Sequence, residues 1–181
     1  STSLAADSTM RATYGAAAMT SVTITARLPR LVPTMAFATG SMAAGSLPRT
    51  IRLFTELKKK GTVFMVIDPR TPTVAALADL HIRLRPGTDG ALALGMMRVM
   101  IDEDIYDKEY VKNYTSGFEE LKEMVRGYSL EEVEKITMVP RCDIVKAARM
   151  IAGGGPAGIM PGTGTEHQTN TVQTLRALSI L

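Results

Sequence analysis

The chain has 181 residues, 45% of them hydrophobic, and its 21 basic and 18 acidic side chains give a net charge of +3. This balance, with four Phe, five Tyr and no Trp, argues against nucleic-acid binding, because the pattern offers neither a long basic stretch nor a stacking platform. The single cysteine excludes a disulfide framework and a cysteine-ligated zinc or iron–sulfur site within the chain. No run of about 18 apolar residues occurs, so direct membrane insertion is not expected.

The first half of the chain has the pattern of alternating strands and helices. Residues 1–33 are rich in Ala, Ser and Thr and show only a weak helical pattern. After them, Ser46 can cap a helix and Gly61 can end it, and the neighbouring short apolar runs are typical of buried parallel strands. The predicted elements are, in order, a strand at 34–39, a helix at 48–60, a strand at 63–67, a short helix at 74–78, a strand at 80–84 and a helix from 88 or 89 to 101.

The second half is richer in charged residues and is predicted to be mostly helical. Ser129 followed by Glu132 fits a capping box, in which each side chain bonds the backbone N–H of the other residue. Cys142 falls inside one of the helical patterns, and we interpret it as a small buried residue. The predicted elements are helices at 107–113, 116–126, 129–137 and 140–152, a strand at 157–160, a loop at 161–164 and a final helix from 168.

This order of elements predicts an α/β fold, with a doubly wound, mostly parallel, Rossmann-like sheet and a helical insertion. Strand–helix–strand units cross over right-handed and place their strands parallel. The chain begins at Ser1 without Met and ends at Leu181 inside a helical pattern, so we expect an internal fragment of a larger multidomain protein. The expected parts are a remnant of a preceding domain at 1–33, a Rossmann-like nucleotide-binding region at 34–104, a helical segment at 105–152, and the start of a further strand–loop–helix unit at 153–181.

Two acidic side chains follow successive predicted strands. Asp68 directly follows the strand at 63–67 and is close to Arg70, and Asp89 follows the loop after the strand at 80–84. Open α/β sheets bind ligands at the carboxyl ends of their strands, where an acid commonly accepts hydrogen bonds from ribose hydroxyls. The structural alternatives are a cap or an ion pair with Arg70 for Asp68, and a helix N-cap for Asp89. Position alone leaves the two kinds of role evenly matched.

Two glycine-containing loops, at 40–46 and 162–167, follow the predicted strands at 34–39 and 157–160. Glycine lets a phosphate approach the backbone closely, and the helix behind the loop offers free N–H groups. Neither loop contains GxxxxGK[ST], and Gly162-Thr163-Gly164 is only a partial GxGxxG, so each loop also fits ordinary turn chemistry. His167 lies in the second loop and is a better functional candidate than His81, which lies in a strand.

Taken together and in order, the motifs resemble those of the molybdopterin oxidoreductases of the dimethyl sulfoxide reductase type. The resemblance covers about residues 34–181. Ile67-Asp68-Pro69-Arg70 matches an IDPR motif, Arg85-Pro86-Gly87-Thr88-Asp89 matches RPGTD, Tyr114-Thr115-Ser116-Gly117-Phe118-Glu119-Glu120-Leu121 matches a YTxGFEEL segment, and the loop from Gly162 to Gln168 is similar to a GxG loop with a Gln/His pair.

The resemblance implies a bis(molybdopterin guanine dinucleotide) cofactor holding molybdenum or tungsten, with two-electron redox or oxygen-atom transfer as the reaction. It implies that Asp68 and Asp89 contact the guanosine ends, with Arg70, Gly87 and Thr88 beside them. The implied contacts to pyrophosphates or pterins are Gly40, Ser41, Gly162, Gly164, His167 and Gln168. No metal ligand is assigned within the chain, and an iron–sulfur cluster is expected only in a preceding N-terminal part.

Three alternatives stay open at this point. The same cofactor can serve a hydratase or transhydroxylase, a relative without cofactor can be structural, as in the large iron–sulfur subunit of NADH dehydrogenase, or the domain can bind another nucleotide. Met42 stands where many relatives have Asn, which favours the structural relative, whereas the complete IDPR and RPGTD motifs argue against it. A small-molecule substrate and an electron-transfer subunit are the expected partners, and the sequence assigns no compartment.

Overall fold

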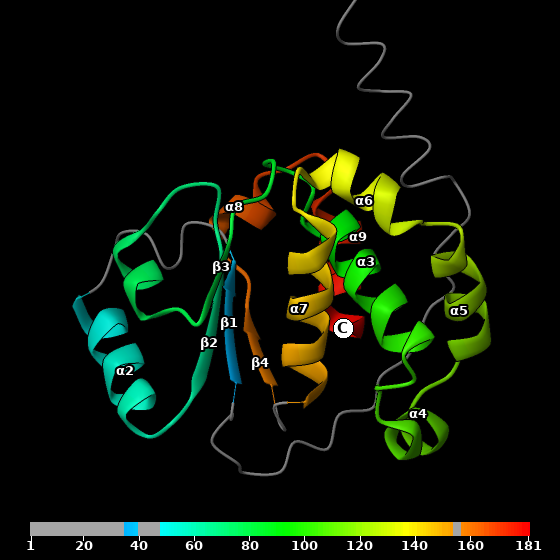
Figure 1. The fold of residues 1–181 in the computed structure, drawn as a ribbon, viewed down its shortest axis with the longest axis horizontal. Helices are drawn as coiled ribbons and strands as arrows, with labels where there is room; N and C mark the ends of the chain where they lie inside the picture. Colours follow the sequence, from blue (N-terminus) through cyan, green and yellow to red (C-terminus); the bar gives the residue numbers. More distant parts are fainter. Residues whose placement is uncertain (1–34, 40–47, 154–156) are drawn as a thin grey trace, which may run out of the picture.

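A computed structural model describes residues 35–39, 48–153 and 157–181 of the chain (Figure 1). Gly40 and Ser41, and the predicted cap Ser46, lie outside these described residues. The elements are β1 (Met35–Thr39), α2 (Pro48–Lys59), β2 (Val63–Ile67), η2 (Thr73–Leu77), β3 (Leu80–Ile82), α3 (Asp89–Asp102), α4 (Lys108–Tyr114), α5 (Phe118–Arg126), α6 (Leu130–Thr137), α7 (Arg141–Gly153), β4 (Ala157–Met160), α8 (Thr163–Glu166) and α9 (Thr171–Ile180).

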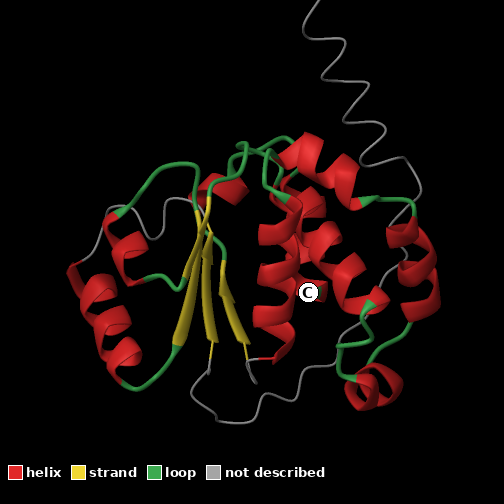
Figure 2. Cartoon of the chain, viewed as in Figure 1, coloured by secondary structure: helices red, strands yellow, loops and turns green. Residues whose placement is uncertain are grey.

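The four strands form one parallel sheet in the order β3-β2-β1-β4. Met35 is in register with both Val63 and Ala157, so β1 is the central strand from which the chain winds in both directions. Helix α2 covers one face of the sheet and α3, α7 and α9 cover the other (Figures 1 and 2). The predicted doubly wound α/β fold is therefore confirmed, and the strand order reverses between β1 and β4, which is the usual place for a ligand crevice.

The junction of α2 and β2 shows how the sequence ends a helix and begins a strand. Gly61 has φ +88°, a left-handed conformation that only glycine adopts freely, and it stops α2 as the pattern predicted. The buried rings of Phe54 on α2 and Phe64 on β2 then pack with their centroids 5.1 Å apart. This small apolar cluster fixes α2 against its face of the sheet.

Helix α3 is the centre of the larger core. It is almost wholly buried because it packs against α5, α6, α7 and α9, and its side chains share one core with those of β2 and β3 (Figure 1). Gly95 allows this close packing, since a Cβ added there would lie 2.8 Å from Cγ1 of Val133 on α6. The capping box at the start of α6 is present, with Ser129 N–H bonded to Glu132 at 3.1 Å and Glu132 N–H bonded to Ser129 at 3.2 Å.

Some sequence-based expectations were wrong in detail. The predicted loop after β4 contains the short helix α8, and the final helix begins at Thr171 and not at 168. The predicted short helix after β2 is present, as a 3-10 helix. Cys142 is exposed, because α7 turns Ile144, Ala147 and Ile151 toward the core and leaves its opposite side in solvent. No helix within the described ranges is long and apolar enough to cross a membrane.

Candidate nucleotide site at the carboxyl edge of the sheet

Asp68 lies immediately after β2 and is 1% exposed. Its backbone N–H bonds to the carbonyl of Ile82 at 3.1 Å, which extends the pairing of β2 with β3 past the end of the strand. Its carboxylate Oδ1 accepts hydrogen bonds from the backbone N–H of Arg70 at 2.8 Å and from Nε of Arg70 at 3.3 Å. One of the structural alternatives for Asp68, the ion pair with Arg70, is therefore present, and it holds the carboxylate in one orientation while the Arg70 side chain remains largely exposed.

His81 supports the same turn from the neighbouring strand. Its Nε2 lies 3.1 Å from the backbone carbonyl oxygen of Asp68, so the ring contacts the main chain and not the carboxylate. Because His81 is on β3, this contact adds a side-chain link between β2 and β3 beyond the backbone ladder. The contact agrees with the structural role that its place in a strand suggested.

Asp89 is the first residue of α3 and is 8% exposed. The N-cap position belongs to Thr88 and no side-chain cap bond is formed, so the alternative in which Asp89 acts as the N-cap is wrong. Burial raises the pKa of the Asp89 carboxyl to about 6, with a further contribution from the nearby Asp68 carboxylate, and the backbone N–H of Asp89 offsets part of this rise. Within the described part of the chain no cation pairs with Asp89.

The loop before α3 is a tight turn built on one glycine. Gly87 has φ +80°, and the Thr88 hydroxyl donates to the carbonyl of Arg85 at 2.6 Å across the turn. The backbone N–H of Arg85 is bonded to the carbonyl of Thr137 at 2.8 Å, which ties the loop to the end of α6. These bonds place Asp89 at the carboxyl edge of the sheet, on the same side as Asp68.

The segment after β4 reaches this edge through α8. Gly162 is the buried N-cap residue of α8, whereas Gly164 and His167 are exposed. Gln168 faces the loop before α3, because a Cβ added to Gly87 would lie 3.1 Å from Oε1 of Gln168. The structure thus brings Asp68, Arg70, Asp89 and the 87–88 turn together with Gln168, and it places His167 farther into solvent.

Asn170 is a member of this cluster that the sequence did not reveal. Its Nδ2 donates to the carbonyl oxygen of Gly87 at 3.0 Å. Asn before a helix is usually a cap, so the only signal in the sequence pointed to a local role. The described residues contain no group of three or more His, Cys, Asp or Glu side chains arranged to hold a metal ion.

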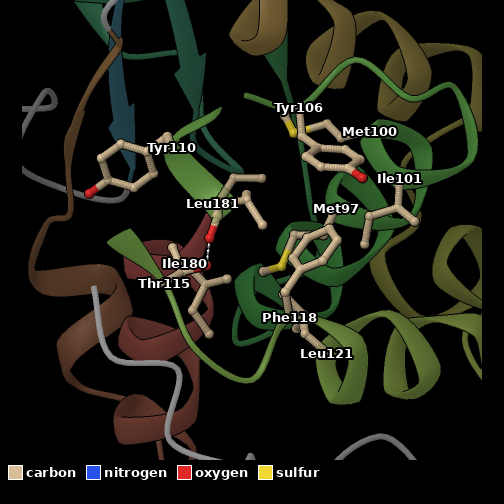
Figure 3. Close-up of a pocket in the computed structure, with 11 residues that line it drawn as sticks. Met97, Met100, Ile101, Tyr106, Tyr110, Thr115, Phe118, Leu121, Ile180 and Leu181 are labelled. Atoms are coloured by element: carbon tan, nitrogen blue, oxygen red, sulfur yellow. Dashed lines mark hydrogen bonds between the residues drawn. The ribbon is translucent and has the colours of Figure 1, made fainter. Parts of the chain in front are cut away.

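An apolar cavity of about 110 Å³ lies elsewhere, between the carboxyl-terminal half of α3, the α4–α5 region and the end of α9 (Figure 3). Its walls are largely Met, Ile, Leu and aromatic side chains, including Tyr106 and Phe118, whose rings are 4.8 Å apart. Met97, the first α3 residue in its wall, is eight residues after Asp89, which is about 12 Å along a helix. The cavity is therefore separate from the carboxyl edge, and its lining contains no Asp, Glu, His, Lys or Arg side chain.

Comparisons with known proteins place this geometry in a family. The model of the molybdopterin oxidoreductase family matches residues 39–181. The chain belongs to the molybdopterin oxidoreductase family. The family holds a molybdenum- or tungsten-containing pterin cofactor, and its members include redox enzymes and a hydratase.

Individual relatives agree with this assignment. The chain is 47% identical over 131 residues to acetylene hydratase of Syntrophotalea acetylenica, covering 71% of this chain and 18% of the relative. It is 39% identical over 147 residues to formate dehydrogenase H of Escherichia coli strain K12, covering 81% of this chain and 21% of the relative. A solved structure of acetylene hydratase from Pelobacter acetylenicus superimposes with a TM-score of 0.76 at 37% identity, over 95% of this chain and 23% of that one. The chain spans about a fifth of the length of these curated relatives.

Proposed function

We propose that the carboxyl edge described above binds the guanosine ends of a bis(molybdopterin guanine dinucleotide) cofactor. The observation that carries the proposal is the buried carboxylate of Asp89, which lies beside Asp68 and has no cationic partner among the described residues. A buried acid without a partner is costly, and hydrogen bonds donated by a ligand remove that cost. Guanine N–H and ribose O–H groups are donors of this kind.

The chemistry of the other residues fits the same group. Arg70 holds the Asp68 carboxylate in one orientation, so this carboxylate can accept hydrogen bonds from a nucleotide. The Arg70 side chain is itself largely exposed, so its positive charge is available to a phosphate. The left-handed turn at Gly87 brings backbone close to the edge without a side chain, next to Thr88. We extend the proposal to Gly162, Gly164, His167 and Gln168 as contacts to pyrophosphate or pterin, and to Gly40 and Ser41 beyond the described residues.

When bound, the cofactor supplies a metal centre that carries out two-electron redox or oxygen-atom transfer. The residues of this chain bind and orient it: Asp68 and Asp89 accept hydrogen bonds, Arg70 holds Asp68, and the glycine turns admit phosphate. A small-molecule substrate and an electron-transfer subunit complete the proposal for the whole protein. With one cysteine in the chain, an iron–sulfur cluster would draw its ligands from outside these 181 residues.

A second reaction is favoured by a specific observation. The match to acetylene hydratase is 47% identical, so a hydration on the same cofactor is a distinct candidate. Net hydration consumes water and transfers no electrons, whereas an oxidoreductase requires an electron acceptor or donor. Turnover that proceeds without any added redox partner would assign the protein to the hydratase class.

The experiment that tests the proposed function measures metal and nucleotide together. The protein that contains this chain is purified from a host able to make the cofactor, its molybdenum and tungsten are measured, and guanine is released by acid hydrolysis. We expect about two guanosines per metal ion, because each of the two molybdopterin guanine dinucleotides of the cofactor carries one guanosine. A folded protein with neither metal nor guanine would contradict the proposal and would favour a structural relative without cofactor.

A further inference from the structure

Two loops that are far apart in the sequence meet at the carboxyl edge through Asn170. The side-chain Nδ2 of Asn170 donates to the carbonyl oxygen of Gly87 at 3.0 Å, although 83 residues separate them. Beside this bond, the Gln168 side chain packs against the α-carbon of Gly87, where an added Cβ would lie 3.1 Å from Oε1. The α8–α9 junction and the turn before α3 are therefore joined at two neighbouring points.

Asn170 is at a helix-capping position, but its side chain bonds to a distant loop. Asn170 is the N-cap residue of α9, where an asparagine side chain ordinarily accepts a hydrogen bond from an N–H of the first turn, worth about 1 kcal/mol. In α9 the N-cap side chain makes no such bond. The amide is directed to the Gly87 turn instead, so its effect falls on the loop that precedes Asp89.

We propose that Asn170 is a positioning residue for the nucleotide end of the cofactor. Its bond to Gly87 fixes the separation between Gln168 on one loop and Asp89, two residues after Gly87, on the other. Hydrogen bonds weaken steeply with distance and angle, so a small displacement of the turn weakens what Asp89 accepts from a ligand. This inference rests on the proposed function, because it assigns Asn170 to the same site.

The test uses Asn170→Ser and Asn170→Asp in the cofactor-loaded protein that contains this chain. Serine and aspartate are as good as asparagine at an N-cap, so a role limited to capping is preserved in both variants. Serine is too short to reach Gly87, and aspartate replaces the donor by a charged acceptor that faces a carbonyl. The matched control is Asn113→Asp, which makes the same change on the exposed surface of α4. The readout is the rate of guanine nucleotide release from the diluted holoenzyme.

We expect Asn170→Ser to release nucleotide about fivefold faster, the factor that one neutral hydrogen bond contributes. Asn170→Asp is expected to release it faster still, and Asn113→Asp at the wild-type rate. If Asn170 acts by positioning Asp89, its effect is lost in an Asp89→Asn background, where Asn170→Ser should add less than about twofold. A full additional fivefold in that background would show a general structural role and overturn the proposal.

Two further outcomes separate this inference from the proposed function. If Asp89→Asn releases nucleotide faster while both Asn170 variants keep the wild-type rate, the nucleotide site stands and the positioning role of Asn170 is wrong. If Asp89→Asn and both Asn170 variants all keep the wild-type rate, the proposed function is contradicted together with this inference. A lower melting temperature of the Asn170 variants with unchanged release also overturns the positioning role.

Discussion

Asp79 and Asp89 lie at opposite ends of the same sheet and have opposite environments. Asp79, at the amino end of β3, accepts a hydrogen bond from the Phe64 N–H at 2.8 Å and forms an ion pair with Lys58. The Lys58 hydrogen bond and then the Phe64 N–H lower the pKa of Asp79, whereas burial raises the pKa of Asp89 to about 6. The amino edge thus holds an acid whose partners come from its own chain. At the carboxyl edge, Asp89 has no cationic partner among the described residues, so its carboxylate can accept hydrogen bonds from a ligand.

The largest expected effect concerns pH and stability without cofactor. The folded-state pKa of Asp89 is above its ordinary value of 3.8, so its favourable contribution is complete below about pH 4 and is lost as the pH rises through 6. The free energy of unfolding should therefore fall by roughly 2–3 kcal/mol over this interval from Asp89 alone. Denaturant titrations of Asp89→Asn should lack this decrease. A wild-type decrease retained in full by Asp89→Asn would assign it to other groups.

The contribution of Asp79 to the free energy of unfolding should change with pH in the opposite direction to that of Asp89. Because its pKa is lowered in the folded protein, its contribution is present above the ordinary carboxyl range and is lost as the pH falls through that range and below. The same titrations on Asp79→Asn should show less loss of stability in acid than the wild type shows. An unchanged acid limb would mean that the Lys58 pair, which is partly exposed, is screened by solvent.

The same substitution, glycine to alanine, can be made at Gly61, away from the proposed site, and at Gly87, within it. Gly61 and Gly87 have φ of +88° and +80°, so alanine costs each about 1–2 kcal/mol of unfolding free energy for the left-handed backbone. A Cβ at Gly61 meets nothing within 4 Å, whereas one at Gly87 meets Gln168 at 3.1 Å. We expect similar losses of stability in both, with loss of bound guanine nucleotide in Gly87→Ala alone. Equal nucleotide contents in the two variants would remove the distinction between the edges.

The smallest effect is expected for Asp79→Ala. It removes the acceptor of the Phe64 N–H and one exposed ion pair, which together contribute about 1 kcal/mol. Thermal unfolding should shift down accordingly, and the guanine content of the purified protein should stay at the wild-type level. A loss of nucleotide in this variant would show that the amino edge also supports the site.

The sequence predicted the parallel sheet and the place of both carboxyl-edge acids, because apolar runs and turn residues are local signals. It left the role of Asp68 undecided, and the structure shows the ion pair with Arg70. The sequence also left Asp89 as a possible N-cap of α3, a position that Thr88 occupies. The start of this helix depends on the preceding turn, and that turn is held by a bond from Arg85 to Thr137 at the end of α6, which no local pattern predicts. Helix α8 was missed because Thr163–Glu166 has two threonines and a glycine, which are weak helix formers. The bond between Asn170 and Gly87 depends on tertiary packing, which no local pattern encodes.

The guanine content of Asp89→Asn, measured beside that of Asp79→Asn, tests the proposed nucleotide site most directly. Both variants replace one carboxylate by an amide in the same sheet, and both are purified from the same cofactor-producing host. We expect Asp89→Asn to lose most of its guanine nucleotide, while its cofactor-free form is at least as stable as wild type near pH 7. We expect Asp79→Asn to keep its nucleotide. Full nucleotide content in Asp89→Asn would contradict the proposal that this buried acid accepts hydrogen bonds from the nucleotide.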